Sequence, residues 1–137
     1  MTDIVANLEQ VNARVLAAAN AAGRSRDSIQ LLAVSKTFAA AAVWTAVMAG
    51  QRAFGESYLQ EALGKIDAVR ALASLHRLQP PIEWHYIGPI QSNKTRQIAG
   101  AFDWVHSVDR EKIAQRLNDG RSAELPPLNV CVQVNVS

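Results

Sequence analysis

The sequence predicts an α/β domain built on a parallel sheet. Three observations support this fold class: short apolar segments alternate with longer segments of helical periodicity, the apolar segments lack the alternation of a half-exposed strand, and glycines or proline pairs separate most segments. Strands buried on both faces are typical of parallel sheets, and strand–helix–strand units close through right-handed crossovers. We expect one leading helix, four strand–helix units and a final strand.

Local signals bound the predicted elements. Thr2 can cap a first helix that Gly23 can end. The apolar residues that share one face of this helix are Ile4, Leu8, Val11 and Val15. The later helices are predicted at residues 39–48, 58–78, 92–99 and 109–118. The strands are predicted at residues 29–34, 52–55, 84–87, 104–108 and 128–136. The breakers between them are Gly50, Gly100, Gly120 and the proline pairs 80–81 and 126–127.

The composition is that of an ordinary globular domain, and we expect a single domain over residues 1–137. Apolar residues make up 49% and charged residues 19%, with a formal net charge of +2. The basic residues are scattered, so we expect no nucleic acid and no membrane as partner. The N-terminal residues lack the apolar stretch of a signal peptide, and the single Cys131 excludes an intramolecular disulfide. A cytoplasmic location is expected.

Two architectures fit five predicted strands. A closed eight-stranded barrel needs roughly 200 residues or more. The strands therefore form either an open doubly wound sheet or part of a barrel. In both, ligand-binding groups gather at the C-terminal ends of the strands.

Lys36 is the one lysine among the polar residues at these strand ends. It follows an apolar strand, so burial would lower the pKa of its amine and make it nucleophilic towards an aldehyde. The alternative, which the pattern alone favours, is a rim lysine whose stem packs on the protein while its charge reaches water. The strand-end groups lie at residues 35–37, 55–57, 85–89, 106–109 and 135–137.

Other strand-end residues have a functional and a structural interpretation. His85 could stack on a planar ligand or be a buried structural histidine, and the structural interpretation is favoured for His106. Residues 88–94 form a turn into a helix that Ser92 or Asn93 could cap and whose N–H groups could hold an anion. Glu56 could support the strand end, whereas Glu61 is expected to be a first-turn helix acid. The histidines lack zinc-ligand spacing.

Three segments in register resemble the pyridoxal 5′-phosphate (PLP) homeostasis proteins of the YggS/PROSC type. They are LLAVSKT at residues 31–37, FGESYLQE at residues 54–61 and WHYIGPIQSNK at residues 84–94. HSVD at residues 106–109 and the segment 125–137 are also similar to that family. The resemblance covers essentially the whole chain.

The resemblance implies an alanine-racemase-like (β/α) barrel of the TIM type, here incomplete with about five strands. It implies a PLP carrier without robust turnover, which holds the cofactor as a Schiff base on Lys36 and acts in PLP homeostasis and in amino- and keto-acid balance. Ser57, His85 and Asn135 are the further cofactor-binding residues that we predict. Ser57 stands where the family usually has asparagine, and the family's phosphate-binding loops follow later strands.

Two other functions stay open from the sequence. An amino-acid racemase-like PLP enzyme would need a second acid or base, for which Tyr58 and His85 are candidates. A truncated interaction module would use Lys36 only as a rim residue. The expected partners are PLP and PLP-dependent apoenzymes, with self-association through the uncovered edge of an incomplete barrel.

Overall fold

Five parallel strands form one sheet in the computed structural model, which describes residues 3–137. The strands are β1 (Ala33–Val34), β2 (Ala53–Glu56), β3 (Glu83–Tyr86), β4 (Trp104–Val108) and β5 (Asn129–Val132). Each strand pairs with the next one along the chain, so the order in the sheet is β1-β2-β3-β4-β5. A doubly wound sheet reverses its strand order at a switch point. The uninterrupted order is that of a barrel wall.

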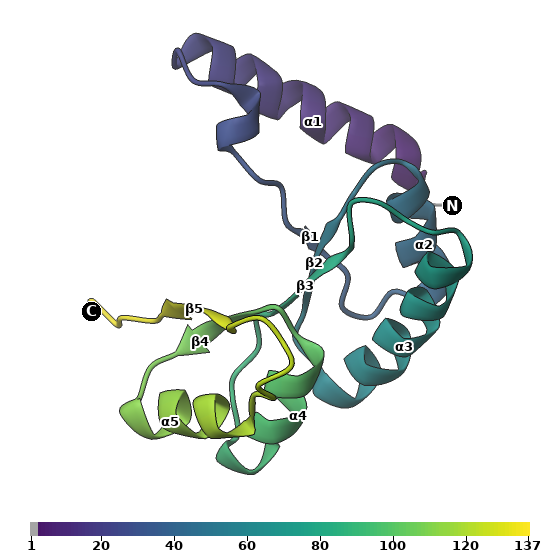
Figure 1. Cartoon of the computed structure of the whole chain (residues 1–137). Coiled ribbons are helices and arrows are strands. Elements are labelled where there is room, and N and C mark those ends of the chain that lie inside the picture. The colour runs from purple at the N-terminus through teal and green to yellow at the C-terminus, as the bar shows by residue number, and fades with distance from the viewer. Residues whose placement is uncertain (1–2) are drawn as a thin grey trace.

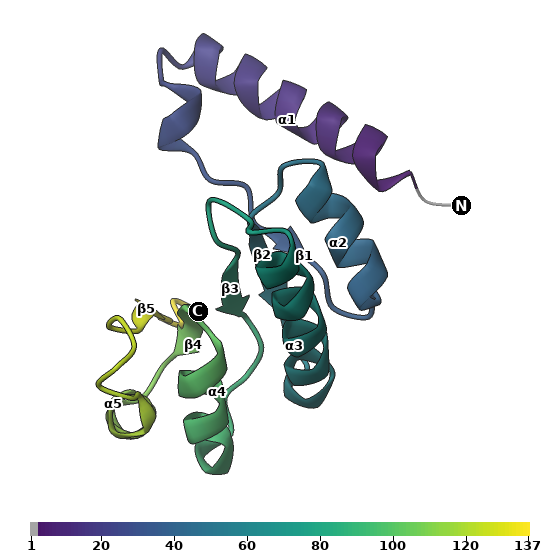
Figure 2. The ribbon, with the colours of Figure 1, turned by 45° about the vertical axis from the view of Figure 1, so that its right-hand side comes forward.

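Helices line one side of this sheet (Figures 1 and 2). They are α2 (Ala40–Met48), α3 (Leu59–Leu75), α4 (Thr95–Ala101) and α5 (Glu111–Gly120), each packed against the next. The leading helix α1 (Ile4–Ala21) packs against α2, and short 3₁₀ turns occupy η1 (Arg26–Ser28) and η2 (Ser92–Lys94). The predicted leading helix and strand–helix alternation are therefore confirmed.

The two faces of the sheet differ in chemistry. We call the face that packs against the helices the outer face and the opposite one the inner face. Phe54, Trp84 and Val105 belong to the buried apolar core shared with the helices. Because side chains alternate along a strand, their neighbours lie on the inner face. There Gly55 faces the side chains of Leu32 and Ile87.

The glycines expected to end the first two helices do so. Gly23 and Gly50 have φ angles of +68° and +106°, the left-handed region in which a side chain would be strained. The predicted cap Thr2 lies outside the described residues. Asp3 fills that role instead, accepting a hydrogen bond of 3.0 Å from the Ala6 backbone N–H.

The strand predicted at residues 29–34 is shorter than expected, because only Ala33 and Val34 pair with β2. Side chains bind the preceding carbonyl groups in place of a neighbouring strand. The Arg26 guanidinium donates to the Ile29 carbonyl, and the Gln51 amide donates to the Leu31 carbonyl at 2.8 Å. The apolar run therefore predicted both the length and the burial of this strand incorrectly, because none of residues 29–34 is buried and Val34 is 50% exposed.

The two later glycines do not end helices as predicted. Gly100 lies inside α4, and Gly120 is the last residue of α5. Neither has a positive φ, so neither forms the left-handed turn that ends a helix. Gly120 serves close packing, because a Cβ there would lie 3.0 Å from Cα of Arg96.

The predicted helix starts at Ser92 and Asp109 are also wrong. Residues 92–94 form a 3₁₀ turn, and α4 then begins without a side-chain cap on Lys94. The Ser92 carbonyl accepts from the Thr95 hydroxyl at 2.9 Å. Helix α5 begins two residues after Asp109, whose carboxylate lies 3.6 Å from the Arg110 guanidinium.

Three further boundaries differ from the predicted ones. Helix α3 covers residues 59–75 of the predicted 58–78, since Arg77 adopts a φ of +49°. Strand β2 extends to Glu56, which pairs with Tyr86 of β3. The strand predicted at 128–136 ends at Val132, and Gln133 makes the last backbone bond to β4, donating to the Val108 carbonyl at 2.8 Å.

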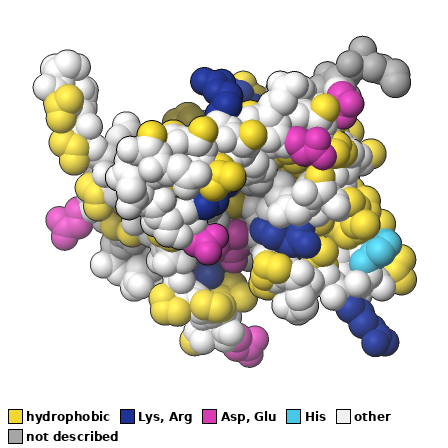
Figure 3. Space-filling view, turned by 90° about the horizontal axis from the view of Figure 1, so that it is seen from above, with side chains coloured by type: hydrophobic (Ala, Val, Ile, Leu, Met, Phe, Trp, Pro, Cys, Tyr) yellow, Lys and Arg dark blue, Asp and Glu magenta, His cyan; other side chains and the backbone are white. Residues whose placement is uncertain are grey.

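The surface carries mixed charge. In the space-filling view of Figure 3, basic and acidic side chains lie interspersed with apolar ones. Among residues 3–137, no helix combines the length and apolar character needed to cross a membrane.

Replacing Ile66 with alanine tests whether the outer-face core stabilises the chain. Ile66 of α3 is 1% exposed, so Ile66→Ala should lower the free energy of unfolding by about 2–5 kcal/mol, measured by urea denaturation. Leu75 ends the same helix and is 77% exposed. Leu75→Ala, a deletion of similar size, should change stability by less than about 0.5 kcal/mol. Equal losses in the two variants would contradict this assignment of the core.

Candidate functional site

Lys36 lies in a turn directly after β1, at the C-terminal edge of the sheet. Its side chain is exposed, and among residues 3–137 no hydrogen bond or ion pair engages its ammonium group. The burial expected from the apolar run is therefore absent in the described part of the chain. The turn presents an accessible, unpaired primary amine.

Ser35, the residue before Lys36, is held at three points. Its backbone N–H donates to the Gly55 carbonyl at 2.9 Å, which continues the β1–β2 ladder by one residue. Its carbonyl accepts from the Lys65 ammonium at 2.8 Å. Its hydroxyl donates to the Glu56 carboxylate. Ser35 is buried, so this side of the turn cannot move without breaking bonds inside the protein.

Thr37, the residue after Lys36, is held by a carboxylate. Its backbone N–H donates to Oε1 of Glu61 at 2.6 Å. Thr37 has a φ of +69°, a conformation that is an outlier for a β-branched residue. A strained backbone persists when surrounding contacts determine it, and the bond to Glu61 is such a contact.

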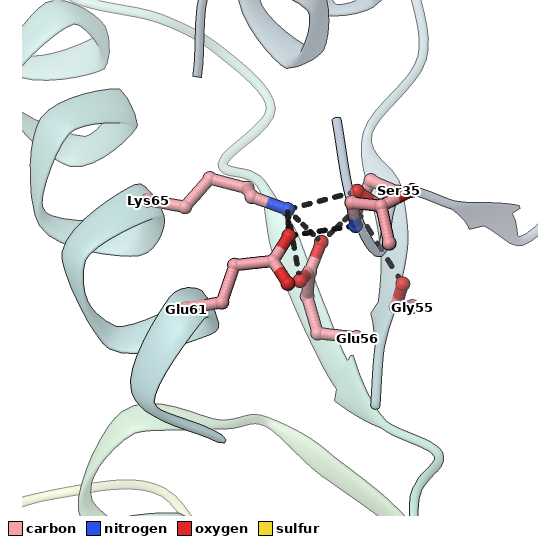
Figure 4. A network of polar contacts seen from close by, with 6 residues as sticks. Ser35, Gly55, Glu56, Glu61 and Lys65 are labelled. Atoms are coloured by element: carbon pink, nitrogen blue, oxygen red, sulfur yellow. Dashed lines mark hydrogen bonds and ion pairs between the residues drawn. The ribbon is translucent and has the colours of Figure 1, made fainter. Parts of the chain in front are cut away.

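Lys65 joins these anchors (Figure 4). It projects from α3, and its side chain is only 4% exposed. Its Nζ lies 3.0 and 2.9 Å from the two carboxylate oxygens of Glu56 and 3.0 Å from Oε1 of Glu61. Glu56 is fully buried at the end of β2. The ammonium thus connects β1, β2 and α3 behind the turn that carries Lys36.

Glu61 is poised to stay ionised. The hydrogen bond from Lys65 lowers the pKa of its carboxyl group below the usual 4.5, and the Thr37 N–H adds to this effect against partial desolvation. The sequence predicted Glu61 as a first-turn helix acid, which is correct. Its contact with the Lys36 turn was not predicted.

A second polar network, made of hydrogen-bonded side chains, lies on the inner face. Nδ1 of His85 is 2.8 Å from Nε2 of His106, and Nε2 of His85 is 2.6 Å from Oε1 of Glu83. The His85 ring also stacks on Trp104, with ring centroids 5.5 Å apart and an interplanar angle of 5°. The same Glu83 oxygen accepts from the Gln30 amide at 3.2 Å. His85 is therefore buried and hydrogen-bonded on the inner face, as its structural interpretation expects, and its contact with a planar ligand stays a prediction.

The partners of His85 determine where its protons lie. A carboxylate only accepts, so Nε2 of His85 carries the proton shared with Glu83. In neutral His85, Nδ1 then accepts a hydrogen bond from Nε2–H of His106. Nδ1 of His106 is therefore the unprotonated nitrogen at the end of this hydrogen-bonded series. Burial and the neighbouring His85 lower the pKa of His106 below its usual 6.5.

The remaining predicted site residues are less closely joined. Ser57 follows β2, and its carbonyl lies so close to Gly88 that a Cβ there would approach it to 2.4 Å. This close approach requires glycine in the third motif. Asn135 is exposed beyond β5, where its side-chain oxygen accepts from the Ser137 N–H and hydroxyl at 3.2 Å each. The structure therefore brings His85 and His106 into contact, whereas no hydrogen bond among residues 3–137 joins Asn135 to either histidine or to Lys36.

Sequence reasoning missed Lys65, although two signals mark it. Lys65 follows Glu61 by four residues, the spacing of a helical ion pair. It also lies on the helix face that carries the buried residues Ala62, Ile66 and Val69. A lysine on an apolar face needs a carboxylate partner, and Glu56 is buried at the adjacent strand end.

The lowered pKa of His106 predicts that the stability of the protein depends on pH. The pKa of His106 is lowered by folding, so the unfolded chain takes up the proton first as the pH falls below about 6.5. The free energy of unfolding should therefore decrease from about pH 7.5 to about pH 5.5, measured by urea denaturation at each pH. His106→Gln should flatten this dependence, whereas the same substitution at the exposed His76 should leave it steep. The lowered pKa of Glu61 acts only below 4.5, outside this range. An unchanged slope in His106→Gln would exclude this role of His106.

Comparisons with known proteins agree with the motifs. Two curated relatives are named pyridoxal phosphate homeostasis protein. The one from Pseudomonas aeruginosa is 61% identical over 137 residues, and the one from Escherichia coli K12 is 53% identical over 137 residues. Each match covers 100% of this chain and 56% of the relative, so the chain spans about half the length of the curated relatives it matches. The predicted resemblance is confirmed.

The fold is similar to those of two solved structures. PipY of Synechococcus elongatus, solved with PLP bound, is 41% identical with a TM-score of 0.59, covering 80% of this chain and 47% of that one. An unknown protein from Bifidobacterium adolescentis is 30% identical with a TM-score of 0.78, covering 85% and 48%. The predicted fold class is confirmed: the five strands and their helices form an incomplete TIM-type barrel.

A family model also matches nearly the whole chain. It describes the N-terminal domain of alanine racemase and matches residues 6–137. The sheet order, the helices on the outer face and the polar strand ends agree with that assignment. The chain belongs to the alanine racemase N-terminal domain family.

Proposed function

We propose that residues 1–137 form a PLP-binding domain that holds the cofactor as a Schiff base on Lys36 and acts in intracellular PLP homeostasis and amino- and keto-acid balance. The observation that carries this proposal is the exposed Lys36 amine at the C-terminal edge of β1, between two anchored residues. The printed names of the relatives, and the PLP bound to PipY, support the choice of cofactor.

The donor set suits an aldehyde cofactor. Bound PLP would supply an aldehyde carbon, to which a lysine amine adds with loss of water and without change of oxidation state. The Lys36 ammonium must first release a proton, and its exposure lets solvent accept it. Among residues 3–137 no carboxylate pairs with this ammonium, so no ion pair must be broken before the amine reacts.

The other proposed cofactor-binding residues differ in whether their polar groups are already engaged in hydrogen bonds. The Ser57 hydroxyl has no hydrogen-bond partner within the described part of the chain. Both ring nitrogens of His85 are engaged, so His85 would contact a cofactor through its ring while His106 offers the free nitrogen. Asn135 would have to exchange its bonds to Ser137 for bonds to the ligand.

An exposed covalent tether also suits a carrier. Imine formation is reversible, so an accessible lysine can release the cofactor to a PLP-dependent apoenzyme, the partner that we propose. Self-association is a further proposal, supported by Val130 and Val132 of β5, which are 46% and 74% exposed.

Reductive trapping tests the assignment of Lys36. The chain is equilibrated with PLP below one molar equivalent, reduced with borohydride, digested and mapped by mass spectrometry. We expect the pyridoxyl group on Lys36, and its loss in Lys36→Ala. Lys112→Ala removes another exposed lysine and should leave the Lys36 adduct unchanged. An adduct spread over Lys94 and Lys112 without Lys36 would refute the proposal.

A racemase-like enzyme is the second candidate, because the matching family model is that of alanine racemase. It needs an acid or base besides Lys36. His85 is committed to Glu83 and His106, which leaves the exposed Tyr58. A carrier predicts that no amino acid exchanges its α-proton for deuterium in the presence of the chain and PLP. Exchange that depends on Tyr58 would favour the enzyme.

A pure interaction module predicts something else. Added PLP would then leave the thermal midpoint of the chain unchanged. A ligand bound only by the folded chain must raise that midpoint. A rise that disappears in Lys36→Ala would separate the carrier from the interaction module.

A further inference from the structure

We propose that Glu61, backed by Lys65 and Glu56, is a positioning residue that clamps the backbone of the Lys36 turn and thereby presents the Lys36 amine for reaction with the cofactor aldehyde. This inference deepens the proposed function and rests on it. It concerns only residues of this chain and assigns a task to the buried charges behind the turn.

The clamp acts on both sides of Lys36 and leaves Lys36 itself free. Lys65 binds the carbonyl of Ser35, and Glu61 binds the N–H of Thr37. The two anchors bind each other, with Nζ of Lys65 3.0 Å from Oε1 of Glu61. One carboxylate oxygen therefore accepts from both Thr37 and Lys65, which closes a ring of contacts around the turn.

The charges explain why this ring is rigid. The Lys65 ammonium faces two carboxylates, those of Glu56 and Glu61. The carboxylates also accept two further hydrogen bonds. The Ser35 hydroxyl donates to Glu56, and the Thr37 N–H donates to Glu61. At the fully buried Glu56 carboxylate such donors strengthen one another, because few water molecules compete for the same oxygens. The turn is thus a part of the ion network rather than a flexible loop beside it.

Thr37 shows what the clamp achieves. Its left-handed conformation is unfavourable for threonine, and the bond to Glu61 supports it together with the turn's own hydrogen bond of 3.1 Å from the Phe38 N–H to the Ser35 carbonyl. Without the Glu61 carboxylate, the turn would relax towards ordinary backbone angles, and Lys36 would sample more directions. A reactive group loses effective concentration when its orientation is no longer restricted.

Glu61 is the most exposed of the three charged residues in the network. Its side chain is 35% exposed, whereas that of Glu56 is fully buried. Removing Lys65 would leave Glu56 as an unpaired buried charge, which destabilises the fold directly. Glu61→Ala removes the acceptor, and Glu61→Gln keeps an oxygen for Thr37 without the charge. Glu111 is the matched control, a first-turn glutamate of α5 that is also exposed.

Two measurements test the clamp. Amide hydrogen exchange of Thr37, measured without PLP, should accelerate in Glu61→Ala and recover in part in Glu61→Gln. The rate of reductive PLP labelling at Lys36 should fall roughly three- to tenfold in Glu61→Ala, with partial rescue in Glu61→Gln. Glu111→Ala should match the wild type in both. Circular dichroism and the thermal midpoint establish that each variant is folded.

The outcomes separate the two proposals. Unchanged Thr37 exchange in Glu61→Ala overturns the clamp, and so does wild-type labelling of Lys36 despite faster exchange. If Glu61→Ala does not fold, Glu61→Gln decides alone: the clamp is overturned when its exchange and labelling both equal those of the wild type. If the wild type itself gives no adduct at Lys36, the proposed function fails, and the role of Glu61 towards the cofactor fails with it.

Discussion

The buried ion pair between Lys65 and Glu56 organises the C-terminal edge of this sheet. Burying two charges is costly unless each is fully hydrogen-bonded, and loss of one partner from such a pair costs about 3–5 kcal/mol. Here the ammonium is surrounded by the Ser35 carbonyl and by the carboxylates of Glu56 and Glu61. The cost is offset only when β1, β2 and α3 hold their present positions. The pair therefore specifies geometry as much as it stabilises the fold.

The two faces of the sheet divide the remaining tasks. The outer face carries the large buried side chains that pack against helices, among them Phe54 and Trp84. The inner face carries polar and aromatic groups that bind one another across strands, as in the chain from Glu83 through His85 to His106. Because neighbouring residues of a strand point to opposite faces, a structural and a functional side chain can stand side by side in the sequence.

The turn that follows β1 links the ion network to Lys36. Ser35 is buried and bound by the network, and Lys36 follows it as an exposed, unpaired residue. A strong internal anchor and a free surface amine thus occupy consecutive positions. Residues that restrict a neighbouring group are hard to recognise by motif, because their contacts go to its backbone rather than to any ligand.

The sequence by itself determined the α/β class, the order of elements, the position of Lys36 at a strand end and the exact span of β4, because apolar periodicity and glycine turns act over a few residues. Only the tertiary structure decided that Lys65 lies buried against Glu56 and that His85 meets His106, because both depend on how distant segments lie together. Glu56 and Lys65 are nine residues apart, and His85 and His106 are twenty-one. The early end of β5 and the capless start of α4 have the same cause, since pairing partners and packing, not local propensity, end those elements.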